Sequence, residues 1–360
     1  MTNETGKSIQ RPVHGSITPA ELRALGMRPE DVIDFSSNIN PLGVSPKVKS
    51  AMAGADASCY PDPDCLSLRE ALAQRCNTDI GNIIVGNGST ELIHLIVRSY
   101  IDNGPAAIIS PTYGEYEFAC RLNGAEPTFI RSTQEARFRL DIDDVCRQID
   151  GIKPALVFLC NPNNPTGVYL DRNDIEKIAS ASSPAPLVLD EAYVPFVERP
   201  WDSTPLLDAG NVIVLHSMTK DHALAGLRLG YALAPTAIIE RIKVLQPFWS
   251  VNAVAQAAGM AALDDDDHVR KGREEIAAAK AYLETEIDRL DLKAIPSGAN
   301  FILVRVGDAA SIRTQLLKHG LVVRDCASFG LPEYIRISIR TLPDCRRLAE
   351  GLQQIFSDKG

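Results

Sequence analysis

Short runs of apolar residues alternate with amphipathic stretches through the middle of the chain, between residues 80 and 235. Apolar residues at helical spacing predict helices at 91–100, 116–123 and 171–180. Short apolar and β-branched runs predict buried strands at 82–85, 106–109, 155–160, 187–189, 212–215 and 231–234. Because strands that alternate with helices build a parallel sheet with helices on both faces, we expect an α/β fold around a mostly parallel sheet.

The hydrophobic pattern changes after Pro247. Residues 268–290 predict a long amphipathic helix. Further strands and a closing helix are predicted after it, at 300–306, 321–324, 334–339 and 344–356. This second α/β group predicts a smaller domain built from residues 1–44 and 248–360, beside a large domain at 45–247.

Composition and charge exclude several classes of protein. A chain of 360 residues with 45% hydrophobic and 23% charged residues is typical of a packed globular protein. Its net charge of −9, without a basic stretch, argues against a nucleic-acid partner. The N-terminus lacks the apolar core of a signal peptide, and no apolar run approaches the ~18 residues that span a bilayer. The missing apolar run leads us to expect no membrane contact. The eight cysteines include no Cys-x-x-Cys pair, so we expect no disulfide framework, no metal site and a cytoplasmic location.

The segment 217–228 carries the most chemistry. The amine of Lys220 can form a Schiff base with an aldehyde cofactor. The hydroxyls of Ser217 and Thr219, together with the guanidinium of Arg228, can hold a phosphate on that cofactor. The segment follows a predicted strand, and ligands of parallel sheets bind beyond the carboxyl ends of the strands. We therefore interpret it as a candidate cofactor site.

Two further motifs follow predicted strands. Asp190 closes an apolar strand, where a carboxylate can pair with a protonated ring nitrogen and turn a pyridine into an electron sink. Glu191 points to the other side of the strand and is interpreted as structural. Asn164 and Tyr193 can each reach a phenolic oxygen on such a ring, although Asn164 also suits a turn. Tyr113 can stack on the ring face or belong to the core.

A glycine-rich run at 86–90 follows a strand and opens a helix. The backbone N–H groups of Gly88, Ser89 and Thr90 can approach a phosphate at the positive end of that helix. The same run also suits an ordinary turn with Thr90 as the helix N-cap, and the pattern alone is compatible with both.

Together these motifs resemble the fold-type I, pyridoxal-5′-phosphate-dependent enzymes of the aspartate aminotransferase superfamily, in the same order along the chain. The resemblance implies a seven-stranded, mostly parallel sheet, pyridoxal 5′-phosphate as cofactor, and a homodimer. It implies Lys220 as the Schiff-base lysine, Asp190 on the pyridine nitrogen, and Asn164 and Tyr193 near the phenolic oxygen. The implied ligands of the cofactor phosphate are Gly88, Ser89, Thr90, Ser217, Thr219, Arg228 and, from the neighbouring subunit, Tyr60.

Within the superfamily the chain is most similar to L-threonine-O-3-phosphate decarboxylase of cobalamin biosynthesis, and histidinol-phosphate aminotransferase is the alternative. The similarity to the decarboxylase lies in segments 34–43, 249–253, 323–327 and 334–340. It implies a lyase that converts O-phospho-L-threonine to (R)-1-amino-2-propanol phosphate, with O-phospho-L-serine as a second substrate to consider. Tyr113 and Tyr193 favour the aminotransferase instead.

The same resemblance implies the residues that bind a small phosphorylated amino acid. Arg336 takes its carboxylate, and its phosphate is held by Arg324, His14, Gly15 and Asn38. The local pattern supports Arg336, because polar and apolar residues alternate along 334–340 and leave one polar face. A bidentate arginine would orient a carboxylate well, although an arginine on a strand face also suits the surface.

Overall fold

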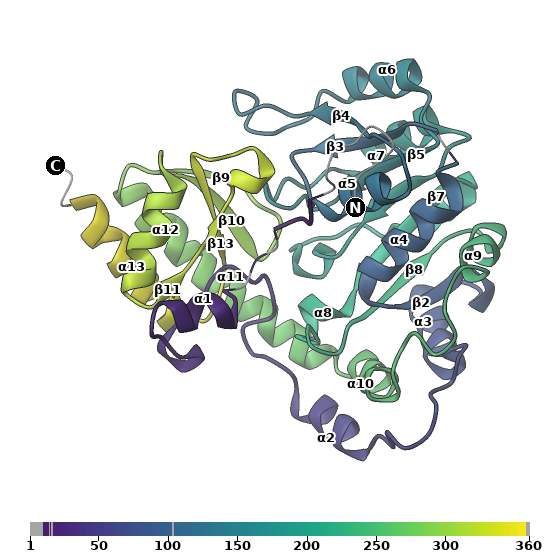
Figure 1. Ribbon diagram of the computed structural model, residues 1–360, viewed down its shortest axis with the longest axis horizontal. Helices are drawn as coiled ribbons and strands as arrows, with labels where there is room; N and C mark the ends of the chain where they lie inside the picture. The colour runs from purple at the N-terminus through teal and green to yellow at the C-terminus, as the bar shows by residue number, and fades with distance from the viewer. Residues whose placement is uncertain (1–9, 14, 16, 103, 358–360) are drawn as a thin grey trace.

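The largest sheet of the protein lies on one side of the molecule (Figure 1), in a computed structural model that describes residues 10–13, 15, 17–102 and 104–357. Its strands are β2 (Ile83–Asn87), β3 (Ala106–Ser110), β4 (Thr128–Arg131), β5 (Leu156–Cys160), β6 (Leu187–Asp190), β7 (Val212–Ser217) and β8 (Leu229–Leu233). Their order across the sheet is β2-β8-β7-β6-β5-β3-β4. Only β8 runs antiparallel to its neighbours; the other pairs are parallel. The expected α/β fold with a mostly parallel sheet is confirmed.

Helices cover both faces of this sheet, because successive side chains of each strand point to opposite sides. Leu187 and Leu189 of β6 pack into one hydrophobic cluster, whereas Val188 packs into another. The first cluster is completed by α2 (Pro46–Gly54), α3 (Leu66–Cys76), α6 (Ile142–Ile152), α7 (Arg172–Ser182) and α10 (Ala253–Leu263). The second is completed by α4 (Gly88–Tyr100), α5 (Glu115–Leu122) and α9 (Thr236–Lys243).

A second group of elements lies beside the large sheet (Figure 1). An antiparallel sheet is formed, in spatial order, by β12 (Arg324–Asp325), β13 (Tyr334–Ser338), β10 (Phe301–Arg305) and β9 (Lys293–Ile295). The helices packed with it are α1 (Pro19–Ala24), α11 (Asp266–Arg289), α12 (Ala309–Lys318) and α13 (Leu342–Ser357). From the N-terminal part of the chain, β1 (Ile33–Asp34) pairs in parallel with β11 (Leu321–Val322). The division into domains at residues 44 and 247 stays a prediction.

Short elements complete the chain. They are α8 (Met218–Asp221) and the 3-10 helices η1 (Pro29–Asp31), η2 (Ile80–Asn82), η3 (Val194–Phe196), η4 (Thr204–Ala209) and η5 (Ala327–Phe329).

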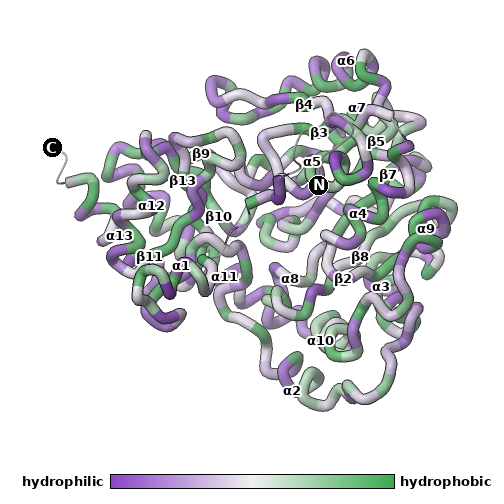
Figure 2. The backbone as a smooth tube through the Cα atoms, viewed as in Figure 1, coloured by the Kyte–Doolittle hydropathy of each residue, from purple (hydrophilic) through white to green (hydrophobic). Residues whose placement is uncertain are grey.

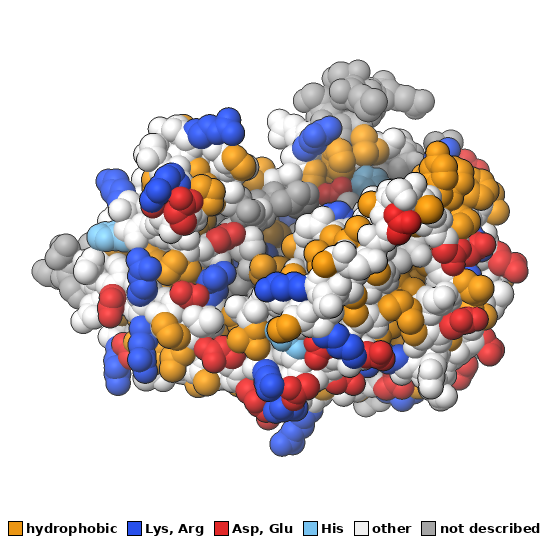
Figure 3. Space-filling view, turned by 90° about the horizontal axis from the view of Figure 1, so that it is seen from below, with side chains coloured by type: hydrophobic (Ala, Val, Ile, Leu, Met, Phe, Trp, Pro, Cys, Tyr) orange, Lys and Arg blue, Asp and Glu red, His pale blue; other side chains and the backbone are white. Residues whose placement is uncertain are grey.

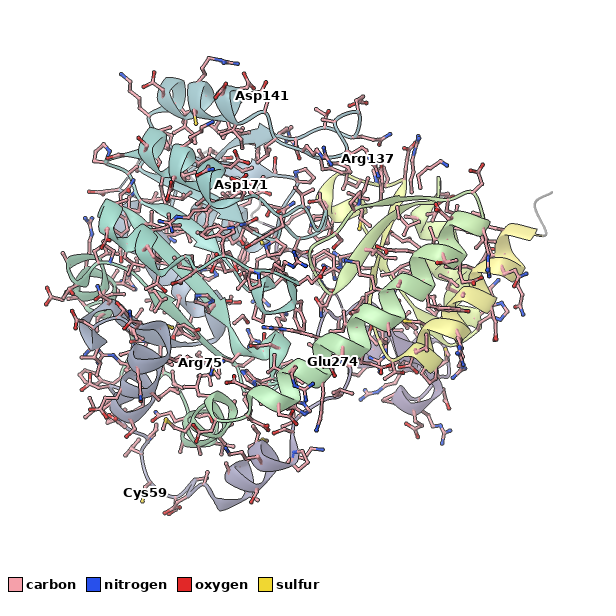
Figure 4. The ribbon with its side chains drawn as sticks, turned by 180° about the vertical axis from the view of Figure 1, so that it is seen from behind. Cys59, Arg75, Arg137, Asp141, Asp171 and Glu274 are labelled. Carbon is pink, nitrogen blue, oxygen red and sulfur yellow. The ribbon has the colours of Figure 1, made fainter. Side chains whose placement is uncertain are left out.

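Local sequence sets the ends of several helices. The side chains of Asp141 and Asp171, labelled in Figure 4, cap α6 and α7, and each accepts a 3.0 Å hydrogen bond from the backbone N–H three residues later. Along the outer helices α6 and α13, hydrophilic and hydrophobic residues are interleaved (Figure 2), as expected for helices with one face in solvent. On the face shown in Figure 3, side chains of both charge signs are interspersed.

Polar contacts join the two groups of elements, and two of them involve arginines labelled in Figure 4. Arg75 on α3 forms an ion pair with Asp266 at the start of α11, and Arg137 donates a 3.4 Å hydrogen bond to the carbonyl of Ala294 on β9. Figure 4 shows both arginines relative to Glu274 on α11. Within the described residues, no helix combines the length and apolar character that a membrane crossing requires. The cytoplasmic location stays a prediction.

Glu191 is a buried carboxyl next to the last residue of β6. Its Oε2 accepts a 2.7 Å hydrogen bond from Ser203, and its Oε1 finds no partner in the part of the chain that the structure describes. Burial raises the pKa of Glu191 to about 8, and the charge of Asp190 acts in the same direction. A group in this position has a structural role that depends on pH.

The Glu191→Gln variant is expected to gain stability relative to the wild type as the pH rises. The folded protein keeps a proton on Glu191 up to a pKa of about 8, whereas the ordinary value is 4.5. The stability from this group is therefore fully present below the ordinary pKa and is lost as the pH rises through about 8, by up to about 1.4 kcal/mol per pH unit. Urea unfolding of both proteins between about pH 5 and 9 measures the difference. Parallel curves for wild type and Glu191→Gln would show that the carboxyl titrates normally.

Candidate active site

Three predicted site residues follow neighbouring parallel strands of the large sheet. In the register of β5, β6 and β7, Cys160 lies opposite Asp190, and Asp190 lies opposite Leu215. The carboxyl ends of these strands therefore meet at one edge of the sheet. Asn164 follows the first of them, Asp190 ends the second, and Lys220 follows the third.

A cavity of about 400 Å³ opens at this edge. Its lining includes Lys220, Asp190, Asn164, Tyr193, Tyr113, Ser89, Thr90, Ser217, Thr219 and Arg228. These residues come from separate parts of the chain, and the structure brings all of them around one space.

Lys220 lies on the single turn of α8 with its amine directed at the cavity. Burial, together with the positive charges of Arg336 and Arg228, lowers the pKa of this amine to about 8, against the opposing charge of Asp190. The amine lies 5.9 Å from the centre of the Tyr193 ring. A lysine in these surroundings keeps a fraction of neutral amine near physiological pH.

Both oxygens of Asp190 are held in place. Oδ2 accepts a 2.6 Å hydrogen bond from the hydroxyl of Tyr116, and Oδ1 accepts a 3.0 Å bond from the backbone N–H of Ala192. Tyr116 is itself fixed, because its fully buried ring stacks on Phe158 at 4.7 Å. Burial raises the pKa of Asp190, while these two hydrogen bonds and Lys220 lower it. A cationic ring nitrogen beside the carboxylate would compensate for its burial.

The opposite end of the cavity suits a phosphate. Gly88 has φ +74°, and a Cβ at this position would lie 2.7 Å from a guanidinium nitrogen of Arg228. The N-terminus of α4 thus lies directly against an arginine, with Ser217 Oγ and Thr219 Oγ1 2.7 Å apart beside the same cavity. A reactive amine, a buried carboxylate and this anion-binding end together fit pyridoxal 5′-phosphate.

A second cavity of about 340 Å³ shares part of its wall with the first, because Asn164 and Tyr113 line both. Arg336 lies at the join: it donates hydrogen bonds from Nη1 to Asn164 Oδ1 and from Nη2 to the carbonyl of Ser36 (2.7 Å). Its Nε is buried and finds no hydrogen-bond partner among the described residues. The guanidinium as a whole places a positive charge in the wall of the second cavity.

The other predicted substrate residues are distributed around this point. Gly15 lines the second cavity, and the amide of Asn38 donates a 3.3 Å hydrogen bond to the hydroxyl of Tyr193. Arg324 lies behind the cavity wall, where its Nη2 donates to the carbonyl of Val13 (2.7 Å) and to Ser328 Oγ (2.6 Å). His14 lies outside the described residues.

Tyr60 does not line the cofactor cavity of its own chain. Its side chain is 80% exposed and stacks on Trp249 at 4.4 Å.

Sequence reasoning missed Tyr116 and Glu115. The carboxylate of Glu115 lines the cofactor cavity and lies 2.8 Å from Nε2 of His94. The available signal for Tyr116 was its place three residues after Tyr113, whose ring meets the ring of Tyr116 edge to face at 5.6 Å.

Comparisons with known proteins agree with this geometry. Residues 30–352 match the family model described as aminotransferase class I and II. A histidinol-phosphate aminotransferase of Symbiobacterium thermophilum is 37% identical over 93% of this chain and 93% of its own length. Further relatives with that name are 33 to 37% identical over 92 to 98% of this chain.

Solved structures share the fold. The histidinol-phosphate aminotransferase of Sinorhizobium meliloti in complex with pyridoxal-5′-phosphate has a TM-score of 0.87 and 26% identity, and the match covers 96% of each chain. The L-threonine-O-3-phosphate decarboxylase of Porphyromonas gingivalis has a TM-score of 0.77 and 26% identity, over 90% of this chain and 99% of its own.

The relatives contradict the interpretation of the sequence as a phosphothreonine decarboxylase, and with it the lyase class and the cobalamin pathway. Three of the four segments behind that interpretation hold or carry other residues assigned to the site. The backbone at Ser36 holds Arg336, β13 carries Arg336, and Trp249 packs on Tyr60. Such contacts position the same groups whichever bond of the substrate breaks, so similarity in them does not identify the reaction.

Replacing Tyr116 by Phe is expected to weaken cofactor binding by about 10- to 100-fold. The change removes one hydrogen bond to the charged Asp190, worth about 1.5–3 kcal/mol, and leaves the stacked ring in place. Titration of the cofactor-free protein with pyridoxal phosphate measures the dissociation constant. Tyr100→Phe is the control, because its ring packs under Arg241 and does not line the cavity. Equal affinities in the two variants would contradict a role for Tyr116.

Proposed function

The chain belongs to the aminotransferase class I and II family, and we propose that it transfers the amino group of a phosphorylated amine of the histidinol-phosphate type to a 2-oxo acid. The observation that carries the proposal is Arg336, which lines the second cavity beside Asn164 and is held there by hydrogen bonds to Asn164 and to the carbonyl of Ser36. The names of the relatives support the substrate class.

Pyridoxal 5′-phosphate is the cofactor. When bound, it supplies an electrophilic carbon for the amino group and a ring that withdraws the electron pair left when the substrate Cα loses its proton. We propose that Asp190 holds the ring nitrogen, that Asn164 and Tyr193 hold the phenolic oxygen, and that Tyr113 covers a ring face. The proposed phosphate ligands are Gly88, Ser89, Thr90, Ser217, Thr219 and Arg228.

In this proposal Lys220 carries the cofactor and moves the proton at the substrate Cα. With a pKa of about 8, roughly a tenth of the amine is neutral at pH 7, whereas an ordinary lysine is almost wholly protonated. A neutral amine can accept the proton, and the nearby positive charges of Arg336 and Arg228 favour its release again.

The reaction needs one site that binds two different anions in turn. We propose that Arg336 binds the carboxylate of the 2-oxo acid and the phosphate of the amino donor. Hydrogen bonds to Asn164 and to the carbonyl of Ser36 fix the orientation of the guanidinium, and with it the directions of its remaining N–H groups. Arg11 adds positive charge along the second cavity, whereas Arg121 there is ion-paired with Glu117 (2.9 Å) and Glu126 (3.4 Å). Arg324, Gly15, Asn38 and His14 are proposed to shape the substrate side.

We propose that the protein acts as a homodimer in which Tyr60 of one chain reaches the cofactor phosphate of the other. The support is an exposed apolar patch of Tyr60, Trp249 and Phe248, of which Phe248 is 79% exposed and packs beside Trp249. An apolar patch of this kind is typical of an interface between subunits.

With L-histidinol phosphate and 2-oxoglutarate, the protein is expected to form glutamate. Lys220→Ala should abolish turnover, and Arg336→Lys should lower kcat/KM by about 10- to 100-fold, because a lysine cannot form the bidentate bonds of the guanidinium. Arg340→Lys is the matched control, since Arg340 pairs with Asp344 (3.0 Å) and lines neither cavity. Release of CO₂ from an O-phosphorylated amino acid without glutamate formation would overturn the proposal.

A further inference from the structure

One short stretch of chain contacts three of the proposed site residues. We call residues 36–40 the bridging segment; in Figure 1 the chain between α1 and α2 passes from one group of elements to the other. Alternate residues of this segment make the contacts. The Ser36 carbonyl accepts from Arg336 at 2.7 Å, and the Asn38 amide donates to the Tyr193 hydroxyl at 3.3 Å. The third residue, Asn40, contacts the turn that carries Lys220.

Asn40 donates hydrogen bonds to two adjacent carbonyls of this turn. Its backbone N–H donates to the carbonyl of Lys220 at 2.8 Å, and its side-chain Nδ2 donates to the carbonyl of Asp221 at 2.9 Å. The carbonyl of Lys220 also accepts from the backbone N–H of Ala223 at 3.3 Å, whereas the carbonyl of Asp221, at the end of the four-residue α8, accepts from the Asn40 side chain. The lysine-bearing turn is therefore anchored to the bridging segment.

The side chain of Asn40 has little freedom. It is 1% exposed, and its Oδ1 accepts a 3.0 Å hydrogen bond from the backbone N–H of Leu42. On its other side lies Gly272 of α11, where an added Cβ would be 2.5 Å from Nδ2 and 2.6 Å from Oδ1. The absence of a side chain at Gly272 lets α11 pack directly against the amide.

We propose that Asn40 is a positioning residue that fixes Lys220 relative to Arg336 through the bridging segment. This inference rests on the roles proposed above for those two residues. The amine that moves the proton and the arginine that binds the substrate anion are then placed by a single rigid stretch of five residues.

Loosening Asn40 should alter the position and the pKa of Lys220 more than the position of Arg336. The charged groups that face the amine are Arg336, Arg228 and Asp190, and burial is the main reason for its low pKa. A turn that can move admits water to the Lys220 nitrogen, and water favours the protonated form of this nitrogen whether it is free or linked to the cofactor. A displacement of about 1 Å at the reacting group lowers kcat by about 100-fold. The KM for the 2-oxo acid should change by less than about threefold, because the Ser36 carbonyl still holds Arg336.

The test uses the full-length holoenzyme with Asn40→Ala and Gly272→Ala. The second variant displaces the same amide without removing it. The matched control is Asn211→Ala, because the buried amide of Asn211 also donates to backbone carbonyls, those of Ala179 (2.9 Å) and Ala185 (3.1 Å), away from both cavities. For each protein we would measure kcat, KM, the unfolding midpoint and the pH midpoint of the visible cofactor absorption.

Asn40→Ala and Gly272→Ala are expected to raise the pH midpoint of the absorption and to lower kcat, whereas Asn211→Ala should lower only the unfolding midpoint. The proposal is overturned if Asn40→Ala leaves absorption and kcat at wild-type values, if only one of the two changes, or if Asn211→Ala alters both equally. If Asn40→Ala does not fold, Gly272→Ala decides by the same criteria. The absorption needs no substrate, so a shifted midpoint in a protein without transfer activity would refute the proposed function and not the role of Asn40.

Discussion

The parallel pairing of β5, β6 and β7 is the constraint on which the site depends. Their register places Cys160, Asp190 and Leu215 side by side, so the residues that follow each strand meet at one edge. Side chains from Asn164, Asp190 and Lys220 thereby surround one cavity although 56 positions separate the first from the last. The apolar strands, buried on both faces by helices, hold this edge rigidly, and the chemistry is left to the loops and short turns beyond it.

Charge at that edge is organised by burial. Lys220 has a lowered pKa and Asp190 a raised one, and in both cases loss of water is the main cause. Each group is thus moved toward its neutral form when the cavity holds no countercharge. A cationic ring nitrogen would supply the positive charge that the carboxylate of Asp190 lacks, and an anionic phosphate would supply the negative charge that Arg228 lacks. One cofactor that carries both groups therefore fits the cavity.

Much of the fold could be predicted from the sequence, because short apolar runs and helical spacing are local signals. The strands β4 and β9 escaped prediction: each is a short edge strand with a single buried residue, and each pairs with one neighbour only. The two-residue pairing of β1 with β11 joins positions far apart in sequence. The site residues that follow strands were predictable by type, whereas Tyr116 and Asn40 act through contacts with distant residues. The reaction class was predicted wrongly, since the segments that suggested it position the site without selecting the bond that breaks.

The central claim is that Lys220 is the amine on which the site is built. Reduction of the cofactor-loaded protein with borohydride, followed by proteolysis and mass spectrometry of the peptides, tests it most directly, because reduction makes the link between lysine and cofactor permanent. The account predicts a pyridoxyl group on the peptide that contains Lys220 and on no other lysine. A modified lysine elsewhere, or an unmodified Lys220 in protein that has bound the cofactor, would contradict it.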